Sequence, residues 1–463
     1  MTELMRQSNE GFKYNQIQAI QNLTKENLED EIFKRGPVVA IFGGQLGDEG
    51  KGKVTSQFKN VDYVAVGPGG GNAGHTVVCT NGKSIALHEL PGGAIIENAK
   101  VYMGQGRSVN ISGLYKEIRE LEENGYNMKN KIIIAGNAQI IFDNLQKKLD
   151  RIIEGLKSKK VGTTAKGIGP TAALKALRTG PNFNILLNDN PDQLNEFMKV
   201  NCNLFNGLNI DELMKEIQEE KELLQNLIDE GYIQIDSTNM ILNQAAHENK
   251  RILIELSQSA MLAADGGMYP YNTSNDTSVN GAMSALNLPE VNTRIAVFKS
   301  IKSKVGGGFF PTKFEDEEFA ENYRKKSGEY GATTKRPRDV GHIDTVEGRK
   351  VLKTNRTDII VFTKTDLLKE LGTNAKIGEK YIDQRDGKEY INEIPATKEQ
   401  YENIQVEYSS AFDLSKDIIG IQNPEDLPEE YTKYIDYLFD KLEFDGNVLL
   451  GTGPCPQEFM VYK

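Results

Sequence analysis

A loop rich in glycine and lysine, GGQLGDEGKGK at residues 43–53, carries an acidic pair, Asp48 and Glu49, in its middle. It is not a standard P-loop, which needs the spacing G-x-x-x-x-G-K-[ST]. Successive glycine N–H groups at the start of a helix still bind phosphate oxygens, and Lys51 and Lys53 can add positive charge. The acids make sense if Mg²⁺ lies beside the phosphate, or if Asp48 accepts a proton during a reaction. The density of glycine, lysine and acid favours such a site over a solvated tight turn.

A second glycine-rich segment, GPGGGNAGHTVV at 67–78, presents Asn72 and His75. Its glycines let the backbone approach a ligand closely. The chain has four histidines, and a lone histidine is more often structural than catalytic. The surrounding glycines strengthen the case for a catalytic role of His75, with a structural role as the alternative.

Two further segments could bind anions. VGTTAKGIGP at 161–170 combines paired threonines with a lysine and glycines, and Arg178 follows it; a turn with a capping threonine is an equally good interpretation. GEYGATTKRPRDVG at 328–341 is a local positive cluster in an acidic chain, which suits a carboxylate or phosphate because arginine can bind either with two hydrogen bonds. A solvated basic loop is the alternative. The cluster comprises Lys335, Arg336 and Arg338 beside Thr333 and Thr334.

The segment TKTD at 363–366 predicts a base-binding site. It follows TDIIVF, an apolar run typical of a buried strand. A carboxylate placed there can accept hydrogen bonds from the N1–H and 2-amino groups of guanine, while Lys364 lies along the ring. GTGP at 451–454 could close over the same base.

Strands and helices must position these motifs. Apolar runs such as KIIIAGNAQIIF and RILIELSQ predict buried strands, and amphipathic stretches such as NIDELMKEIQEEKELLQNLIDEG predict helices between them. This alternation indicates an α/β fold with a large, mainly parallel central sheet flanked by helices. The motifs are scattered from residue 43 to residue 454, so we expect residues 37–463 to form a single large catalytic domain with loop and helical insertions. Residues 1–36 are polar and are expected to form a helical N-terminal extension.

The composition excludes several classes of protein. The chain has 463 residues, 38% of them hydrophobic, which is enough for a large core. Its net charge of −11 argues against a nucleic-acid or membrane-surface partner. The three cysteines lie far apart, so neither a disulfide framework nor a zinc site is expected. With no long apolar window and no signal-peptide pattern, a cytoplasmic protein is predicted.

Taken together, the motifs closely resemble those of adenylosuccinate synthetase, in the same order over about residues 38–456. GGQLGDEGKGK is similar to the family signature G-x-Q-W-G-D-E-G-K-G-K, and GGNAGHTVV to its second motif. VGTTAKGIGP, VGGGFFPT at 305, GATTKRPR, TKTDLL and GTGP each have a counterpart. One such motif is only suggestive, but seven in order are specific.

The resemblance implies a homodimeric, Mg²⁺-dependent ligase of purine nucleotide biosynthesis. The family uses GTP to phosphorylate the 6-oxygen of IMP, and the amine of aspartate then displaces that phosphate to give adenylosuccinate, GDP and phosphate. Phosphorylation is needed because a lactam oxygen is a poor leaving group.

The resemblance also implies roles for individual residues. Asp48 would take the N1 proton of the base and bind Mg²⁺ together with the Gly74 carbonyl, His75 would donate to the phosphate in transfer, and Gln258 would complete the catalytic set. The residues expected to bind GTP are Gly47, Glu49, Gly50, Lys51, Gly52, Lys364, Asp366, Thr452 and Gly453. Those expected to bind IMP are Asn72, Thr164, Gln258, Thr273 and, from across the dimer interface, Arg178. Those expected to bind aspartate are Thr333, Thr334, Arg336 and Arg338.

Several positions depart from the family pattern. Leu46 replaces the signature tryptophan, Lys166 replaces an arginine, and ELSQS at 255–259 replaces E-G-A-Q-G. Asp276 replaces an asparagine, and His342 a tryptophan. Two alternatives therefore stay open: a viral-type synthetase that joins aspartate to dGMP with ATP, dATP or GTP, and a catalytically idle nucleotide-binding protein on the same scaffold. The retained Asp48 and His75 favour the IMP enzyme over both.

Overall fold

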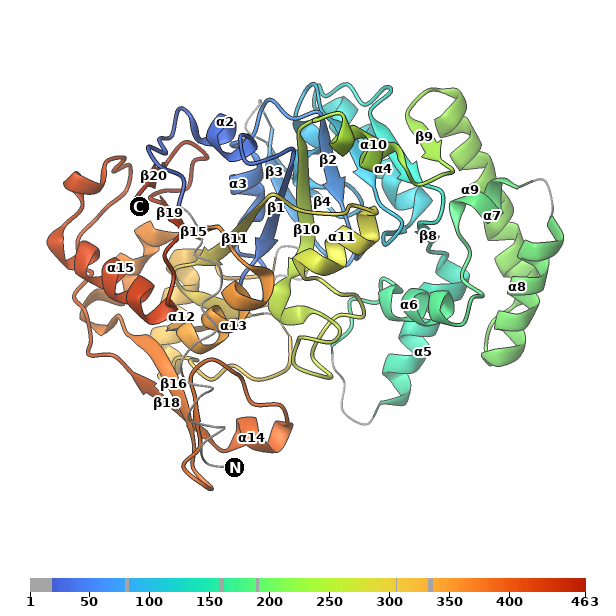
Figure 1. Ribbon diagram of the computed structural model, residues 1–463. Coiled ribbons are helices and arrows are strands. Elements are labelled where there is room, and N and C mark those ends of the chain that lie inside the picture. The colour runs from blue at the N-terminus through green and yellow to red at the C-terminus, as the bar shows by residue number, and fades with distance from the viewer. Residues whose placement is uncertain (1–18, 80–82, 158–161, 189–190, 305, 332–335) are drawn as a thin grey trace, which may run out of the picture.

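A ten-stranded sheet forms the centre of the computed structural model, which describes residues 19–79, 83–157, 162–188, 191–304, 306–331 and 336–463 (Figure 1). Neighbouring strands run parallel, except that the edge strand β20 is antiparallel to β19. In spatial order the strands are β20 (Phe459–Val461), β19 (Asn447–Gly451), β15 (Ile359–Thr363), β11 (Thr293–Lys299), β1 (Val38–Gly43), β10 (Ile252–Ser259), β2 (Tyr63–Val66), β5 (Lys100–Met103), β7 (Ile132–Ala135) and β9 (Ile233–Asp236).

The strands form because their sequences are apolar on both faces. Every residue of β1 and of β10 is buried, as expected for parallel strands covered on two sides by helices. The predicted α/β class with a mainly parallel central sheet is therefore confirmed.

Helices lie on both sides of the sheet and extend beyond its β9 end (Figure 1). The amphipathic stretch NIDELMKEIQEEKELLQNLIDEG forms α9, which begins after Asn209; the side chain of that residue accepts the N–H groups of Asp211 and Glu212. The helices are α2 (Leu28–Phe33), α3 (Lys51–Thr55), α4 (Ile111–Glu123), α5 (Lys148–Leu156), α6 (Ile168–Ala176), α7 (Phe183–Leu187), α8 (Pro191–Leu204), α9 (Ile210–Asp229), α10 (Ile241–His247), α11 (Val279–Leu286), α12 (Glu317–Ser327), α13 (Thr345–Asn355), α14 (Lys398–Glu402) and α15 (Glu429–Leu442).

Short strands outside the main sheet carry several of the motifs. They are β3 (His75–Val78) with β4 (Ser84–Leu87), β6 (Ser108–Val109) with β8 (Gln139–Ile140), β12 (Lys302–Lys304) with β13 (Asp339–Gly341), and a sheet of β14 (Ile343–Asp344), β16 (Ile377–Asp383), β17 (Glu389–Tyr390) and β18 (Ile404–Tyr408).

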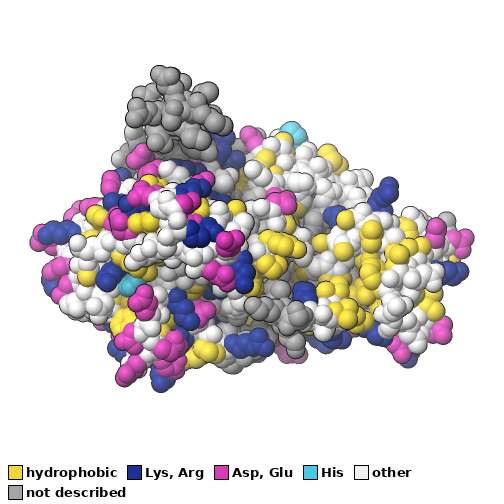
Figure 2. All heavy atoms as spheres, turned by 90° about the horizontal axis from the view of Figure 1, so that it is seen from below, with side chains coloured by type: hydrophobic (Ala, Val, Ile, Leu, Met, Phe, Trp, Pro, Cys, Tyr) yellow, Lys and Arg dark blue, Asp and Glu magenta, His cyan; other side chains and the backbone are white. Residues whose placement is uncertain are grey.

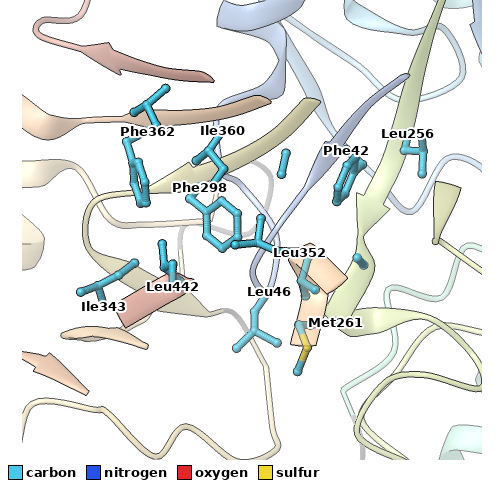
Figure 3. Packing of buried hydrophobic residues seen from close by; sticks show 14 of the residues in the cluster. Phe42, Leu46, Leu256, Met261, Phe298, Ile343, Leu352, Ile360, Phe362 and Leu442 are labelled. Carbon is cyan, nitrogen blue, oxygen red and sulfur yellow. The ribbon is translucent and has the colours of Figure 1, made fainter. Parts of the chain in front are cut away.

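Leu46, where the resemblance expects tryptophan, belongs to the largest apolar cluster. It is 5% exposed and shares this cluster with Phe298, Met261 and Leu352 (Figure 3). The aliphatic side chain of Leu46 thus fixes the loop after β1 to the core. Unlike tryptophan, leucine has no indole N–H that would need a hydrogen-bond partner when buried.

The parallel arrangement decides where the motifs meet. The loops after β1, β2, β15 and β19 all leave the sheet at the carboxyl ends of their strands, and the last residues of β10 lie at the same edge. These loops contain the segments 44–50, 67–75, 364–366 and 452–453. In open parallel sheets this edge is where ligands bind.

In the segment before residue 37, the described residues contain one helix, α2, which is six residues long. Its Leu28, Ile32 and Phe33 are buried in a cluster with residues of the main sheet. The described residues 19–27 form turns and irregular structure instead of the predicted helix, and residues 1–18 lie outside the described residues.

Candidate active site

The loop between β1 and α3 is built from residues in left-handed backbone conformations. Gly47 has φ +109°, Asp48 φ +57° and Gly50 φ +87°. Gly50 caps the start of α3, which therefore begins directly at Lys51. A Cβ on Gly52 would lie 3.0 Å from the Thr76 carbonyl oxygen, so α3 approaches β3 closely. These features produce a helix N-terminus behind a glycine-rich turn, an arrangement that binds phosphate.

Glu49 holds this loop together from inside. Its carboxylate is fully buried and accepts the Gly47 N–H (2.8 Å), the Gln45 N–H (3.2 Å), the Lys51 ammonium (3.1 Å) and the Ser259 hydroxyl. Burial alone would raise the pKa of Glu49, but the charge of Lys51 and these hydrogen bonds bring it below its ordinary value. The side chain of Glu49 therefore shapes the loop, and a nucleotide could reach this residue only through its backbone.

His75 is fixed by a buried glutamate. Its Nδ1 lies 2.6 Å from Glu255 on β10, and both side chains are at most 3% exposed. Glu255 also accepts the N–H groups of Gly92 (3.2 Å) and Gly93 (3.1 Å). Burial would raise the pKa of Glu255, but the nearby charge of His75 and these hydrogen bonds lower it. Its carboxylate is thus ionised at neutral pH and orients the imidazole.

The second ring nitrogen of His75 is the feature that points to chemistry. Among the described residues nothing hydrogen-bonds to Nε2, although the atom is buried. An unsatisfied buried nitrogen is costly unless it serves a bound group. With Nδ1 held by Glu255, only Nε2 is left to donate to a ligand.

Asn72 and Gln258, both predicted to bind IMP, are in contact. The Gln258 side-chain amide donates to Asn72 Oδ1 over 2.8 Å. Gln258 Oε1 is buried and has no partner among the described residues. Thr273 is half-buried and its N–H donates to the Leu262 carbonyl. The loop after β2 and the end of β10 therefore meet at one place.

The other two predicted IMP residues lie in different surroundings. Thr164 is exposed. Arg178 is exposed, has φ +63° and lines a cavity of about 720 Å³ with Gln105, Gln139 and Lys175. The described lining of that cavity includes none of the other four predicted IMP residues.

A buried glutamate links three of the predicted groups. Arg338 contacts Asp48 (2.6 Å) and Glu329 (2.8 Å). Lys364 also contacts Glu329 (2.6 Å), as does Lys299 (3.1 Å). The structure thus brings the predicted catalytic acid, one predicted aspartate-binding arginine and one predicted GTP-binding lysine to a shared ionic cluster.

Glu329 is the centre of that cluster and is 2% exposed. Burial would raise the pKa of Glu329, yet the three cations outweigh it and hold this pKa far below the ordinary value. Glu329 is therefore ionised throughout the physiological range. The Ser303 hydroxyl donates a further hydrogen bond to it (2.8 Å).

The predicted base-binding residues lie beside one another at the ends of β15 and β19. Asp366 is 6% exposed, and burial raises the pKa of its carboxyl. Lys53 donates to the Gly453 carbonyl (2.5 Å), while Thr452 is buried and its hydroxyl donates to the Ile421 carbonyl (2.8 Å). A Cβ on Gly453 would lie 2.5 Å from the Glu458 carboxylate, so a larger residue there would require the Glu458 side chain to move.

The predicted aspartate loop is described in part. Thr333 and Thr334 lie outside the described residues. Arg336 is exposed, whereas Arg338 is buried by its contacts with Asp48 and Glu329. Among the described residues of this set, Arg338 is thus tied into the ionic cluster.

The residues present fit magnesium better than a transition metal. In the described part of the chain no three His, Cys, Asp or Glu side chains are grouped to hold a metal ion. Asp48 offers one exposed carboxylate and Gly74 a backbone carbonyl, both hard oxygen donors. Mg²⁺ is typically held by one or two carboxylates together with substrate phosphate oxygens.

Sequence reasoning missed three residues that shape the site: Glu255, Glu329 and Ser259. A single acid inside the apolar run RILIELSQ is a signal for Glu255, because a buried charge needs a partner. The position of Glu329 directly before the GATT motif carries a weaker signal. Ser259 is one of the departures from the family pattern, and its hydroxyl contact with Glu49 is visible only in the structure.

The fold and the candidate site are together typical of an α/β nucleotide enzyme: the glycine-rich turn before α3, the loop after β15 and a histidine oriented by a buried glutamate lie at the carboxyl edge of a parallel sheet. Comparison with known proteins identifies the family within this class. The family model for adenylosuccinate synthetase matches residues 40–460. The chain belongs to the adenylosuccinate synthetase family, whose members are carbon–nitrogen ligases with GTP as co-substrate.

Individual relatives agree with this assignment. Adenylosuccinate synthetase from Paramecium tetraurelia is 35% identical over 92% of this chain and 98% of its own length. The enzyme from Thermodesulfovibrio yellowstonii is 33% identical over 91% and 98%. The solved structure of fully ligated adenylosuccinate synthetase from Plasmodium falciparum aligns with a TM-score of 0.82 at 32% identity, covering 92% of this chain and all of that one.

A phage enzyme shares the fold at a greater distance. Cyanophage S-2L succinoaminodeoxyadenylate synthetase, solved with dGMP and dATP, aligns with a TM-score of 0.57 at 16% identity over 92% of this chain and 95% of that one. The likeness at this identity concerns the fold alone. Relatives above 30% identity carry the adenylosuccinate synthetase name, so the predicted reaction class holds over the viral alternative. In the described residues, no helix has the length and apolar character needed to span a membrane.

Proposed function

We propose that this chain joins L-aspartate to the 6-position of IMP at the expense of GTP, through a 6-phosphoryl intermediate, giving adenylosuccinate, GDP and phosphate. One observation carries the proposal: His75 is oriented by the buried Glu255, and its buried Nε2, which has no partner among the described residues, lies at the same sheet edge as the glycine-rich loop 43–53. A protein that only bound a nucleotide would not need this arrangement, which speaks against the idle alternative.

The first step would be phosphoryl transfer to the base. Asp48 would remove the N1 proton of IMP, so that negative charge moves to the 6-oxygen, which attacks the γ-phosphorus of GTP and releases GDP. His75 Nε2–H would donate to the phosphoryl group in transfer and stabilise its developing charge. Asp48 is accessible to the base of a bound nucleotide, because its side chain is 42% exposed.

The second step would be displacement. The aspartate amine attacks carbon 6, and phosphate leaves with the former 6-oxygen. Arg338, with Arg336, Thr333 and Thr334, would bind the aspartate carboxylates, because guanidinium groups bind carboxylates with paired hydrogen bonds. The Asp48–Arg338 ion pair would then open when substrate arrives.

Nucleotide binding would use the remaining residues. The α3 N-terminus would hold the GTP phosphates, with Lys51 beside them, and Asp366 with Lys364 would recognise guanine. Asn72, Gln258, Thr164 and Thr273 would hold IMP. Asp48 and the Gly74 carbonyl would bind Mg²⁺, which when present neutralises phosphate charge.

A homodimer is also part of the proposal. Figure 2 shows apolar side chains gathered on one face over the half of the molecule that contains α5 to α8. Exposed side chains of that half include Leu156 (82%), Leu204 (58%), Leu177 (52%) and Ile153 (42%). Such a patch favours a protein partner, and a second copy would allow Arg178 to reach the IMP phosphate across the interface. A cytoplasmic location stays a prediction from composition.

A paired acceptor assay tests the proposal. Purified protein is incubated with Mg²⁺, GTP, aspartate and either IMP or dGMP, and product is followed by absorbance. We expect adenylosuccinate from IMP and at least tenfold slower turnover with dGMP; product from dGMP alone would replace IMP by the viral substrate. Asp48→Asn is expected to lower kcat by about 10²-fold or more, in the range of lost general-base catalysis, while circular dichroism stays unchanged. A variant with near-normal turnover would remove Asp48 from the mechanism.

A further inference from the structure

The segment that precedes the main domain lies against the predicted base-binding loop. In Figure 1 the chain before α2 runs toward strands β19 and β20, between which the loop 453–458 is formed. We infer that residues 19–35 brace this loop and that Lys25 is a positioning residue for GTP. The inference rests on the proposed function, since Gly453 is among the residues that the family resemblance expects to bind GTP.

The loop 453–458 is held mainly by its carbonyl groups. Lys53 donates to the carbonyls of Gly453 (2.5 Å) and Glu458 (3.1 Å). Gln57, also from the region of α3, donates to the Pro456 carbonyl (2.8 Å). The phosphate-loop helix thus holds the loop from one side.

Lys25 holds the same loop from the N-terminal segment. Its ammonium donates to the Gln457 carbonyl, and it lies 4.9 Å from the centre of the Phe459 ring. It also reaches Gln422 Oε1 at 3.4 Å. Lys25 therefore contacts the loop and the first residue of β20 at once, through a charged hydrogen bond and a cation–π contact.

The segment around Lys25 is itself anchored at both ends. Ile20 exchanges two hydrogen bonds with the side chain of Asn447: its N–H donates to Oδ1 (2.6 Å), and its carbonyl accepts from Nδ2 (3.0 Å). Asn447 is 3% exposed and begins β19, the strand that leads into the loop. The brace is thus attached to the same strand whose end it holds.

Helix α2 supplies the second anchor. Leu28, Ile32 and Phe33 are buried in a cluster that also contains Val54 and Phe58, from α3 and the turn after it, and Leu449 and Phe459, from β19 and β20. Glu29 accepts the N–H groups of Lys59 (3.1 Å) and Asn60 (2.7 Å), just after α3. The segment therefore joins the element that would hold the GTP phosphates to the loop that would close over its base.

This geometry separates Lys25 from the reacting groups. Lys53 cannot be used to test the loop alone, because it lies in the phosphate loop itself. Lys25 contacts neither the phosphate loop nor any predicted IMP or aspartate residue in the described contacts. Loss of its ammonium should loosen 453–458 and weaken GTP binding, while the other two substrates bind as before.

Steady-state kinetics of Lys25→Ala, Lys25→Arg and the control Lys34→Ala test the inference. Lys34 is a matched surface lysine whose ion pair, with Glu31 at 2.5 Å, lies within the same segment. In Lys25→Ala we expect KM for GTP to rise about three- to tenfold, as for loss of one charged hydrogen bond, with KM for IMP and aspartate within about twofold. Lys25→Arg restores GTP binding, because arginine keeps the donor and the cation. An unchanged KM for GTP, an equal rise in all three KM values, or the same effect in Lys34→Ala overturns the inference.

Hydrogen exchange distinguishes failure of the brace from failure of the proposed function. Amide exchange of 453–458 is measured by mass spectrometry in the protein without nucleotide. Faster exchange in Lys25→Ala than in wild type and Lys34→Ala is expected, and unchanged exchange overturns the brace whatever the enzyme's substrate. A wild type inactive with IMP would refute the proposed function, and the exchange result would still decide on the brace.

Discussion

Neutralising Glu329 should destabilise the protein through charges left without a partner. Glu329→Gln keeps the size of the side chain but removes the negative charge that faces Lys299, Arg338 and Lys364. Because the pKa of Glu329 lies far below its ordinary value, its contribution to stability is fully present at pH 7 and is lost only as the pH falls through the folded-state pKa. At neutral pH, Glu329→Gln therefore removes the full contribution of this carboxylate to stability.

The size of the effect follows from burial. Removing one partner from a buried ion pair costs about 3–5 kcal/mol, because the other charge stays desolvated. Lys299 is 1% exposed and has Glu329 as its ion-pair partner in the described structure. The entropy of unfolding is about 2.1 cal/mol/K per residue, hence about 1 kcal/mol per degree for 463 residues. We expect Tm to fall by about 3–5 °C.

Thermal unfolding followed by fluorescence or calorimetry measures this change. Glu321→Gln is the control, since Glu321 pairs with Arg324 (2.9 Å) and Lys325 (3.6 Å) but is 39% exposed, and we expect its Tm to change by at most about 1 °C. Adding Lys299→Met to Glu329→Gln should recover part of the loss, because it removes an uncompensated buried charge. If Glu329→Gln unfolds within 1 °C of wild type, or no more easily than the control, the reasoning about this cluster is wrong.

Two further predictions concern pH. Burial, reinforced by the charge of Glu117, raises the pKa of Glu89 to about 7. Below its ordinary pKa this residue costs the folded state no stability, but the cost grows as the pH rises toward 7, because the buried carboxyl resists ionisation. Glu89→Gln should therefore raise Tm by about 3 °C at pH 8 and little at pH 5, and an equal change at both pH values would contradict the assignment. Burial lowers the pKa of His342 to about 4. Above its ordinary pKa this residue costs the folded state nothing, but as the pH falls toward 4 the unfolded chain takes up a proton that the buried imidazole resists, and the protein loses stability. In His342→Phe the fall in Tm between pH 7 and pH 5 should therefore be smaller by about 2 °C than in wild type, and an equal fall in the same scans would refute the prediction.

Much of the fold could be predicted because strands and helices have local signals. β1, β10 and β15 are continuous apolar runs, and α9 has the apolar period of a helix with an asparagine cap. The order of strands has no such signal. β10 lies between β1 and β2 although about 190 residues separate it from β2, a pairing that depends on packing rather than on local sequence.

The location of the candidate site in the fold could be predicted where its residues lie in one motif. The turn before α3 and the Asp366 segment both lie at strand ends, as expected for a parallel sheet. The supporting groups were not predictable, since each acts on a residue far away in sequence. Glu255 orients His75 across 180 positions, and Glu329 matters only because three cations meet it in space.

The departures from the family pattern can be understood through such partners. Ser259 replaces a small residue next to the phosphate loop, yet its hydroxyl donates to the buried Glu49, which in turn receives Lys51 and two loop N–H groups. The serine hydroxyl therefore gives the Glu49 carboxylate a further hydrogen-bond donor. Leu46, in the same loop, packs into the largest apolar cluster. The loop is thus held by a different set of contacts while its backbone conformation, with Asp48 at φ +57°, keeps the acid outside the core. The backbone conformation of the loop can therefore persist when neighbouring residues change, provided that the buried charges of the loop keep their partners.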